Sequence, residues 1–87
     1  MKYLVIDIRG PEEFMRSHVE GAINIPPSEI MSGAKALEGI DKNTPLILYC
    51  ISGARSNAAK HILSQQGFTN ITNGINKDQT NKLLQKT

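Results

Sequence analysis

Apolar residues fall in short runs along the chain, and segments with helical spacing of polar and apolar positions separate these runs. The runs are rich in β-branched residues, which favour buried strands. They predict strands over about 3–7 ("YLVID"), 22–25 ("AINI"), 46–50 ("LILYC") and 68–72 ("FTNIT"). Two prolines end the second strand, and Asn73-Gly74 is predicted to form a turn after the fourth.

The intervening segments predict four helices. The first covers 11–17, because Pro11 suits a first helical position and acidic residues follow it. Ser28 is the predicted N-cap of a second helix, "EIMSGAKAL", which Gly33 weakens. A third runs from about Ser56 to Gly67, and the polar segment "KDQTNKLLQK" forms a fourth, anchored by Leu83 and Leu84.

Strands that alternate with helices over short connections predict an α/β fold with a mainly parallel, twisted sheet and helices on both faces. In such a sheet, the functional crevice lies beyond the carboxyl ends of the strands. Asp7 and Cys50 both follow predicted strands at that edge. For Asp7 and Arg9, an ion pair or cap that holds the strand end is favoured over catalysis, and Tyr49 is expected to pack on the sheet face.

Composition narrows the classes of function. The 87 residues are expected to form a single domain over 1–87, and a net charge of +2 is too small for a nucleic-acid or membrane surface. The N-terminal apolar run is too short for a signal peptide or a membrane span. As written, the protein is expected to be cytoplasmic, or periplasmic if a signal peptide was removed from a precursor.

Cys50 is the single cysteine, so an internal disulfide and CxxC motifs are excluded. His18 and His61 have no ligand spacing, and no metal site is expected. Lone cysteines are often buried and inert, which is one interpretation of Cys50. However, the loop that follows, with Gly53 before a helix, would point backbone N–H groups at the sulfur and stabilise a thiolate nucleophile.

Arg55 has two possible roles. It would bind an oxyanion in bidentate geometry or form an ion pair with Asp7, Glu12 or Glu13. Four residues separate Cys50 from Arg55, whereas cysteine phosphatases have five. The shorter loop favours a compact persulfide over a phosphate ester, although a small phosphatase or arsenate reductase stays an alternative.

Four segments together resemble the single-domain rhodanese-like sulfurtransferases. They are "CISGARS", similar to the active-site loop Cys-x-x-Gly-x-Arg-Ser, and "VIDIRGPEEF", "SHVEGAINIP" and "GFTNITNG", which follow the family's order over nearly the whole chain. The sequence departs from the usual signatures at Ser17 and Glu20, which replace glycine and proline. A glycine pair near Asn73 is reduced to one glycine, which changes the expected pocket wall.

The resemblance implies a rhodanese-like fold and transfer of sulfur from thiosulfate through a Cys50 persulfide. The acceptor would be cyanide, a thiol or a protein, and no cofactor is implied. Arg55 would bind thiosulfate or lock the loop, and His18 would fix a turn by a structural hydrogen bond. A noncatalytic sulfur carrier or protein-binding module is the alternative. The persulfide would be cradled by backbone N–H groups of the loop, namely those of Ile51, Ser52, Gly53, Ala54, Arg55 and Ser56.

Overall fold

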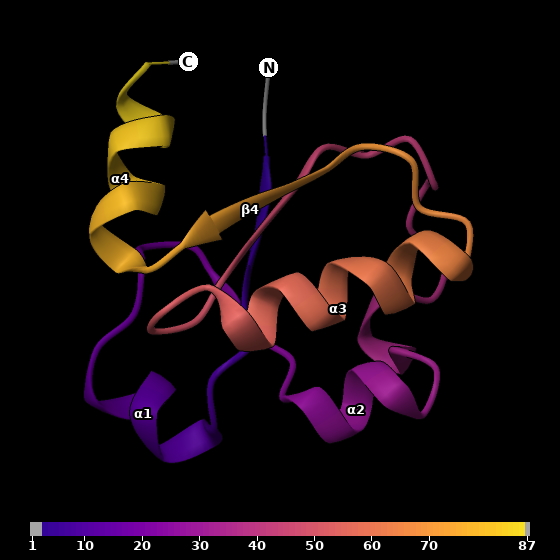
Figure 1. Cartoon of the computed structure of the whole chain (residues 1–87), viewed down its shortest axis with the longest axis horizontal. Coiled ribbons are helices and arrows are strands. Elements are labelled where there is room, and N and C mark those ends of the chain that lie inside the picture. The colour runs from indigo at the N-terminus through magenta and orange to yellow at the C-terminus, as the bar shows by residue number, and fades with distance from the viewer. Residues whose placement is uncertain (1–2, 87) are drawn as a thin grey trace.

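The computed structural model describes residues 3–86, so residues 1, 2 and 87 of the predicted domain lie outside the described residues. Helices and strands alternate along most of this range (Figure 1). In chain order, the elements are β1 (Leu4–Asp7), α1 (Pro11–Arg16), β2 (Ile23–Asn24), α2 (Pro27–Met31), the 3₁₀ turn η1 (Lys35–Leu37), β3 (Leu46–Tyr49), α3 (Ala54–Gln65), β4 (Ile71–Ile75) and α4 (Lys77–Gln85).

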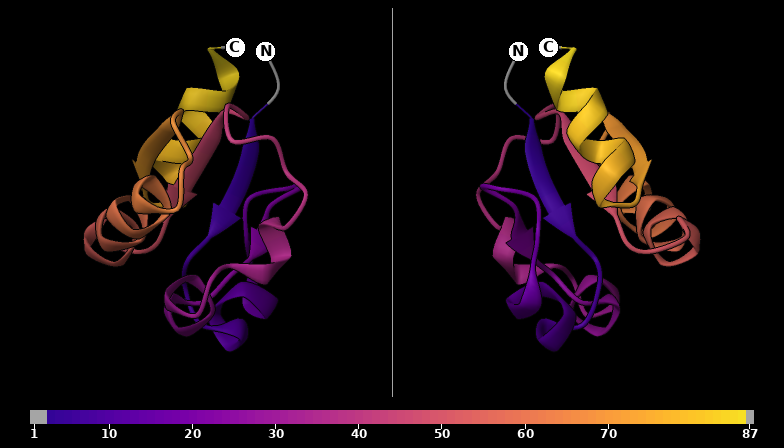
Figure 2. Two further views of the ribbon diagram at one scale, coloured as in Figure 1. Left: turned by 90° about the vertical axis from the view of Figure 1, so that its right-hand side faces the viewer. Right: turned by 90° about the vertical axis from the view of Figure 1, so that its left-hand side faces the viewer.

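The four strands form one parallel sheet in the order β2-β1-β3-β4. β1 and β3 lie at its centre, in a register that pairs Asp7 with Tyr49. The carboxyl ends of these two strands therefore meet at the same edge. The side views in Figure 2 show α3 on one flank of the sheet and α4 on the other. The predicted parallel α/β fold is confirmed.

Alternating side chains of the central strands supply two cores, one on each face of the sheet. One face carries Ile6 and Leu48, and α2, η1 and α3 cover it with Ile30, Leu37 and Leu63. The opposite face packs against α1 and α4, and its residues are Val5, Ile47 and Tyr49 with the partly buried Phe14, Leu83 and Leu84. Because both faces of the sheet are buried, the central strands are unbroken apolar runs in the sequence.

Two predicted helix starts are each two residues late. α2 begins at Pro27 with Pro26 in the N-cap position, so Ser28 lies inside the helix and is not its cap. A residue before proline is held extended, which fixes the boundary there. α2 also ends at Met31, because Gly33 has a φ of +112° and breaks the predicted longer helix. α3 begins at Ala54, ahead of the predicted Ser56.

The prediction of a turn at Asn73-Gly74 is also wrong, because both residues belong to β4. The strand carries a bulge there, so that Leu48 pairs with Asn73 and Tyr49 with Ile75. Gly74 sits so close to α4 that an added Cβ would lie 2.2 Å from the Thr80 hydroxyl oxygen. The glycine therefore marks a close approach of strand and helix, not a chain reversal.

Among residues 3–86, no helix has the length and apolar character that a membrane span requires.

Candidate active site

Cys50 lies at the carboxyl edge of the sheet, immediately after β3, and its side chain is buried. Its backbone N–H donates to the Ile75 carbonyl at 3.1 Å, which ties the start of the loop to the end of β4. The chain then turns at Gly53, whose φ of +91° favours glycine, and enters α3 at Ala54. A Cβ at Gly53 would also lie 3.3 Å from the Ile75 side chain. The loop is therefore short, fixed at both ends and dependent on glycine.

The Cys50 sulfur is surrounded by hydrogen-bond donors. The Gly53 N–H donates to it at 3.2 Å, and the Ser56 hydroxyl lies 3.5 Å away. Burial by itself raises the pKa of the thiol, but hydrogen bonds from the Ser56 hydroxyl and from the N–H groups of Ser56, Gly53 and Arg55 outweigh it. Together they lower the pKa of Cys50 to about 7. A thiolate, the reactive form, is thus well populated at neutral pH.

Asn73 supports this arrangement from β4. Its side-chain oxygen lies 2.7 Å from the Ser56 hydroxyl and accepts the Ile75 N–H at 3.0 Å, while its NH₂ group donates to the Gly53 carbonyl. A serine hydroxyl has one proton and two acceptor lone pairs. The Ser56 hydroxyl can therefore donate to Asn73 when Cys50 is a thiol and to the sulfur when Cys50 is a thiolate. Asn73 is a site residue that the sequence prediction missed, because it was assigned to a turn.

We expect the Ser56→Ala variant to raise the pKa of Cys50 above about 7, because it removes the hydroxyl hydrogen bond that favours the thiolate. The rate of alkylation by iodoacetamide should rise with pH as the thiolate forms, and its midpoint should move upward in the variant. At pH 7 the variant should react several-fold more slowly. Ser64→Ala, an exposed change in the same helix, is the control. Identical pH profiles for the two variants would contradict the role of Ser56.

Arg55 forms an ion pair with a residue of α1. Its guanidinium donates to both carboxylate oxygens of Glu13, at 3.1 and 3.3 Å. This hydrogen bonding raises the pKa of Arg55 and lowers that of Glu13. The Cys50 sulfur adds a smaller contribution that also raises the pKa of Arg55. Of the two sequence interpretations, the ion pair is the one present here, and its partner is Glu13.

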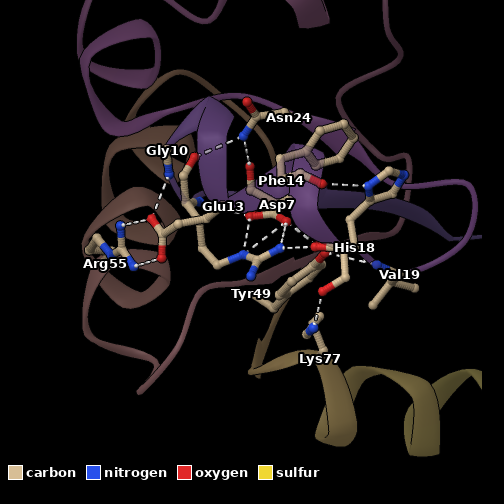
Figure 3. Close-up of polar contacts among 12 residues, drawn as sticks. Asp7, Gly10, Glu13, Phe14, His18, Val19, Asn24, Tyr49, Arg55 and Lys77 are labelled. Carbon is tan, nitrogen blue, oxygen red and sulfur yellow. Dashed lines mark hydrogen bonds and ion pairs between the residues drawn. The ribbon is translucent and has the colours of Figure 1, made fainter.

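A buried polar network lies beside the loop (Figure 3). The Asp7 carboxylate is fully buried and accepts hydrogen bonds from the Arg9 backbone N–H, from the Arg9 guanidinium and from the Tyr49 hydroxyl, the last at 2.7 Å. The Tyr49 oxygen in turn accepts the Val19 N–H. Burial, followed by the contact with Asp7, raises the pKa of Tyr49 to about 12. The predicted Asp7–Arg9 ion pair is confirmed, whereas the polar role of Tyr49 was missed.

A pocket of about 200 Å³ opens over Cys50. Its lining comes from the ends of β1 and β3 and from the beginning of α4. The lining residues are Arg9, Cys50, Ile51, Asn76, Lys77 and Asp78. Asn76 and Lys77 follow β4 just as Cys50 follows β3. Neither residue was predicted from the sequence, because the predicted strand ends at residue 72, three residues before the end of β4.

The six predicted cradle residues differ in their positions. Gly53, Arg55 and Ser56 direct backbone N–H groups at the sulfur. The Ala54 N–H contacts the Ser52 hydroxyl instead, and Ile51 lies at the pocket rim, largely exposed.

The His18 Nδ1–H donates a hydrogen bond to the Phe14 carbonyl oxygen at 2.8 Å, and the imidazole stacks on the Phe14 ring. Its implied structural role in the turn after the first helix is confirmed.

Comparison with known proteins identifies the family. The sequence model described as the rhodanese-like domain matches residues 1–77. The chain belongs to the rhodanese-like family. Among solved structures, this rhodanese-like chain is similar to one described as "rhodanese with anions from E. coli", with a TM-score of 0.79 and 38% sequence identity over 90% of this chain and 91% of that one. The expected rhodanese fold is therefore confirmed.

Two named relatives are sulfurtransferases. The chain is 44% identical over 68 residues to "Thiosulfate sulfurtransferase PspE" of Escherichia coli, an alignment that covers 78% of this chain and 64% of the relative. It is 31% identical over 67 residues to "Thiosulfate sulfurtransferase GlpE" of Pseudomonas aeruginosa, covering 77% and 58%. Both relatives are named as thiosulfate sulfurtransferases, and the chain spans less than two thirds of the length of either one.

Proposed function

We propose that the protein is a thiosulfate sulfurtransferase that carries the transferred sulfur as a persulfide on Cys50. The observation that supports this most directly is the ring of donors around the Cys50 sulfur, with a pKa near 7. A nucleophile that is already ionised at neutral pH needs no general base. The similarity to PspE and GlpE, both named as thiosulfate sulfurtransferases, supports thiosulfate as the donor.

The reaction would proceed in two displacements. In the first, the Cys50 thiolate attacks the outer sulfur of thiosulfate, a new S–S bond forms, and sulfite leaves with the electron pair of the broken S–S bond. The persulfide then carries the negative charge, one atom farther from the protein. The N–H groups of Gly53, Arg55 and Ser56 would stabilise this charge, as they stabilise the thiolate.

In the second displacement, a thiophile attacks the outer sulfur of the persulfide. With cyanide, thiocyanate forms and the Cys50 thiolate is restored, so that atoms and charge balance without an oxidant or a cofactor. A small thiol or a cysteine of a protein acceptor would react in the same way. The pocket over Cys50 and the exposed side chain of Ile51 at its rim leave this sulfur approachable from one side.

The test is the intact mass of the reduced protein before and after incubation with thiosulfate. We expect a gain of one sulfur atom that cyanide reverses, with stoichiometric thiocyanate. A persulfide that forms but passes only to a protein thiol would favour the sulfur-carrier alternative. Failure to acquire sulfur, with the thiol shown to be free by alkylation, would overturn the proposal. Hydrolysis of a chromogenic phosphate ester would instead favour the phosphatase alternative.

A further inference from the structure

The pocket over Cys50 contains three charged side chains besides the cysteine, and their partners differ. Arg9 is paired with the buried Asp7 carboxylate, whose two oxygens accept hydrogen bonds from its Nε and Nη2. Asp78 is exposed and lies in the first turn of α4, where the helix dipole stabilises a carboxylate. Within residues 3–86, Lys77 forms no ion pair. Its ammonium is therefore the cation of this pocket that remains available to an anion.

Ser17 fixes the position of this ammonium. The Lys77 Nζ donates to the Ser17 hydroxyl oxygen, a contact between α4 and the loop after α1 that Figure 3 shows below the Asp7 network. The carbonyl of the same serine accepts a hydrogen bond from Arg9 at 2.6 Å. Ser17 thus holds the two cationic side chains of the pocket through separate oxygens. An ammonium has three donors, so two of the Lys77 N–H bonds stay free for another acceptor.

Arg55 lies close to the Cys50 sulfur, but its charge already has a partner. Its guanidinium is committed to Glu13 in bidentate geometry, and its side chain lines a small apolar groove with Pro27 and Met31. A sulfur donor whose far end is an oxyanion needs a cation beyond the sulfur that Cys50 attacks. Lys77 lies across the same pocket from a different element, with its charge unneutralised.

We propose that Lys77 binds the oxyanion end of the sulfur donor and that Ser17 is a positioning residue that aims the Lys77 ammonium into the pocket. This inference rests on the proposed function. It selects donors that end in a sulfonate or similar group, as thiosulfate does. During the first displacement, Lys77 keeps its proton and stays on the oxygens while the S–S bond breaks, so sulfite leaves from an ion pair. The residue therefore favours binding of the donor and stabilises the leaving group.

Two alkylating reagents test the charge at this site without any sulfur transfer. Iodoacetate carries a carboxylate and iodoacetamide is its neutral counterpart, and both react with the Cys50 thiolate. We expect Lys77→Gln to slow iodoacetate about tenfold, the size of one charged hydrogen bond, and to leave iodoacetamide unchanged. Lys77→Arg should keep the wild-type ratio of the iodoacetate rate to the iodoacetamide rate, and Ser17→Ala should lower this ratio in part. Lys82→Gln removes one positive charge from an exposed position of the same helix, and it should react with both reagents at the wild-type rates.

Kinetics with thiosulfate then test the donor. Lys77→Gln should raise the KM for thiosulfate about tenfold relative to Lys82→Gln, with a smaller fall in kcat. Equal iodoacetate rates and equal KM values in the two variants would overturn the assignment of Lys77. The proposed function fails separately: a wild-type protein that acquires no sulfur from thiosulfate would overturn that function, while the alkylation rates would still decide whether Lys77 binds anions at Cys50.

Discussion

Replacement of Cys50 by alanine is expected to abolish sulfur transfer, because the persulfide has no other atom on which to form in a chain with one cysteine. The turnover with thiosulfate and cyanide should fall by at least about a thousandfold, as the loss of a covalent nucleophile typically does. Cys50→Ser should behave alike, since an alcohol is un-ionised at neutral pH and forms no persulfide. Thiocyanate release and intact mass measure the effect.

The folded state of both variants must be shown to be intact. Cys50 is buried but small, so thermal unfolding midpoints should stay close to that of the wild type. Ser64→Ala, which lies outside the pocket, should retain full turnover. Transfer by Cys50→Ser at the wild-type rate would contradict the persulfide mechanism. If Cys50→Ser loses both sulfur transfer and cooperative unfolding, its loss of transfer would reflect a disturbed fold. A Cys50→Ala variant that unfolds cooperatively would then test the role of the cysteine in sulfur transfer.

The Asp7→Asn variant is expected to cause the largest loss of stability, about 3–5 kcal/mol, because it removes one partner of a buried ion pair. The Arg9 guanidinium would lose its counter-charge while staying buried, and the Tyr49 hydroxyl would lose a charged acceptor. Arginine keeps its proton in proteins, so the guanidinium cannot escape the penalty by becoming neutral. Small domains have only about 5–15 kcal/mol of stability, so the variant should be marginal.

Urea unfolding at pH 7 measures this loss of free energy. Glu13→Gln is the matched control, because it also neutralises a carboxylate paired with an arginine, but at a half-exposed site where such pairs contribute about 0–1 kcal/mol. Asp7→Asn should lower the urea midpoint far more than Glu13→Gln does. Equal midpoints would mean that the buried pair contributes no more than a surface pair. If Asp7→Asn does not fold, Tyr49→Phe provides a milder test, since it removes only the hydroxyl from the network.

Part of this site is local in the sequence, and that part could be predicted. Cys50, Gly53 and Ser56 lie within seven residues, and a strand, a glycine and a helix start give the backbone little choice of path. The inward-pointing N–H groups follow from that path. The ion pair of Asp7 with Arg9 was foreseen for the same reason, since only one residue separates the partners.

The ion-pair partner of Arg55 lies far away in the sequence and could not be chosen from the sequence alone. Asp7, Glu12 and Glu13 were all possible from the sequence, and the choice of Glu13 depended on how α1 lies against the start of α3. Asn73 and Lys77 were missed for a related reason. The Asn73-Gly74 pair has the composition of a turn, but pairing of β4 with β3 and the packing of Gly74 on Thr80 extend the strand through it. Tertiary packing here overrides the local preference.

The sequence by itself therefore determined the parallel α/β class, the position of Cys50 at a strand end and the loop that lowers its pKa, because each depends on residues close together in the chain. Only the tertiary structure decided which charges surround Cys50. Arg55 forms an ion pair with Glu13, and Arg9 forms one with Asp7. Lys77 lines the pocket without an ion pair among the described residues. The physical reason is that the site forms where strand ends meet. Side chains more than twenty residues apart then compete for the same few carboxylates, and only their final distances settle that competition.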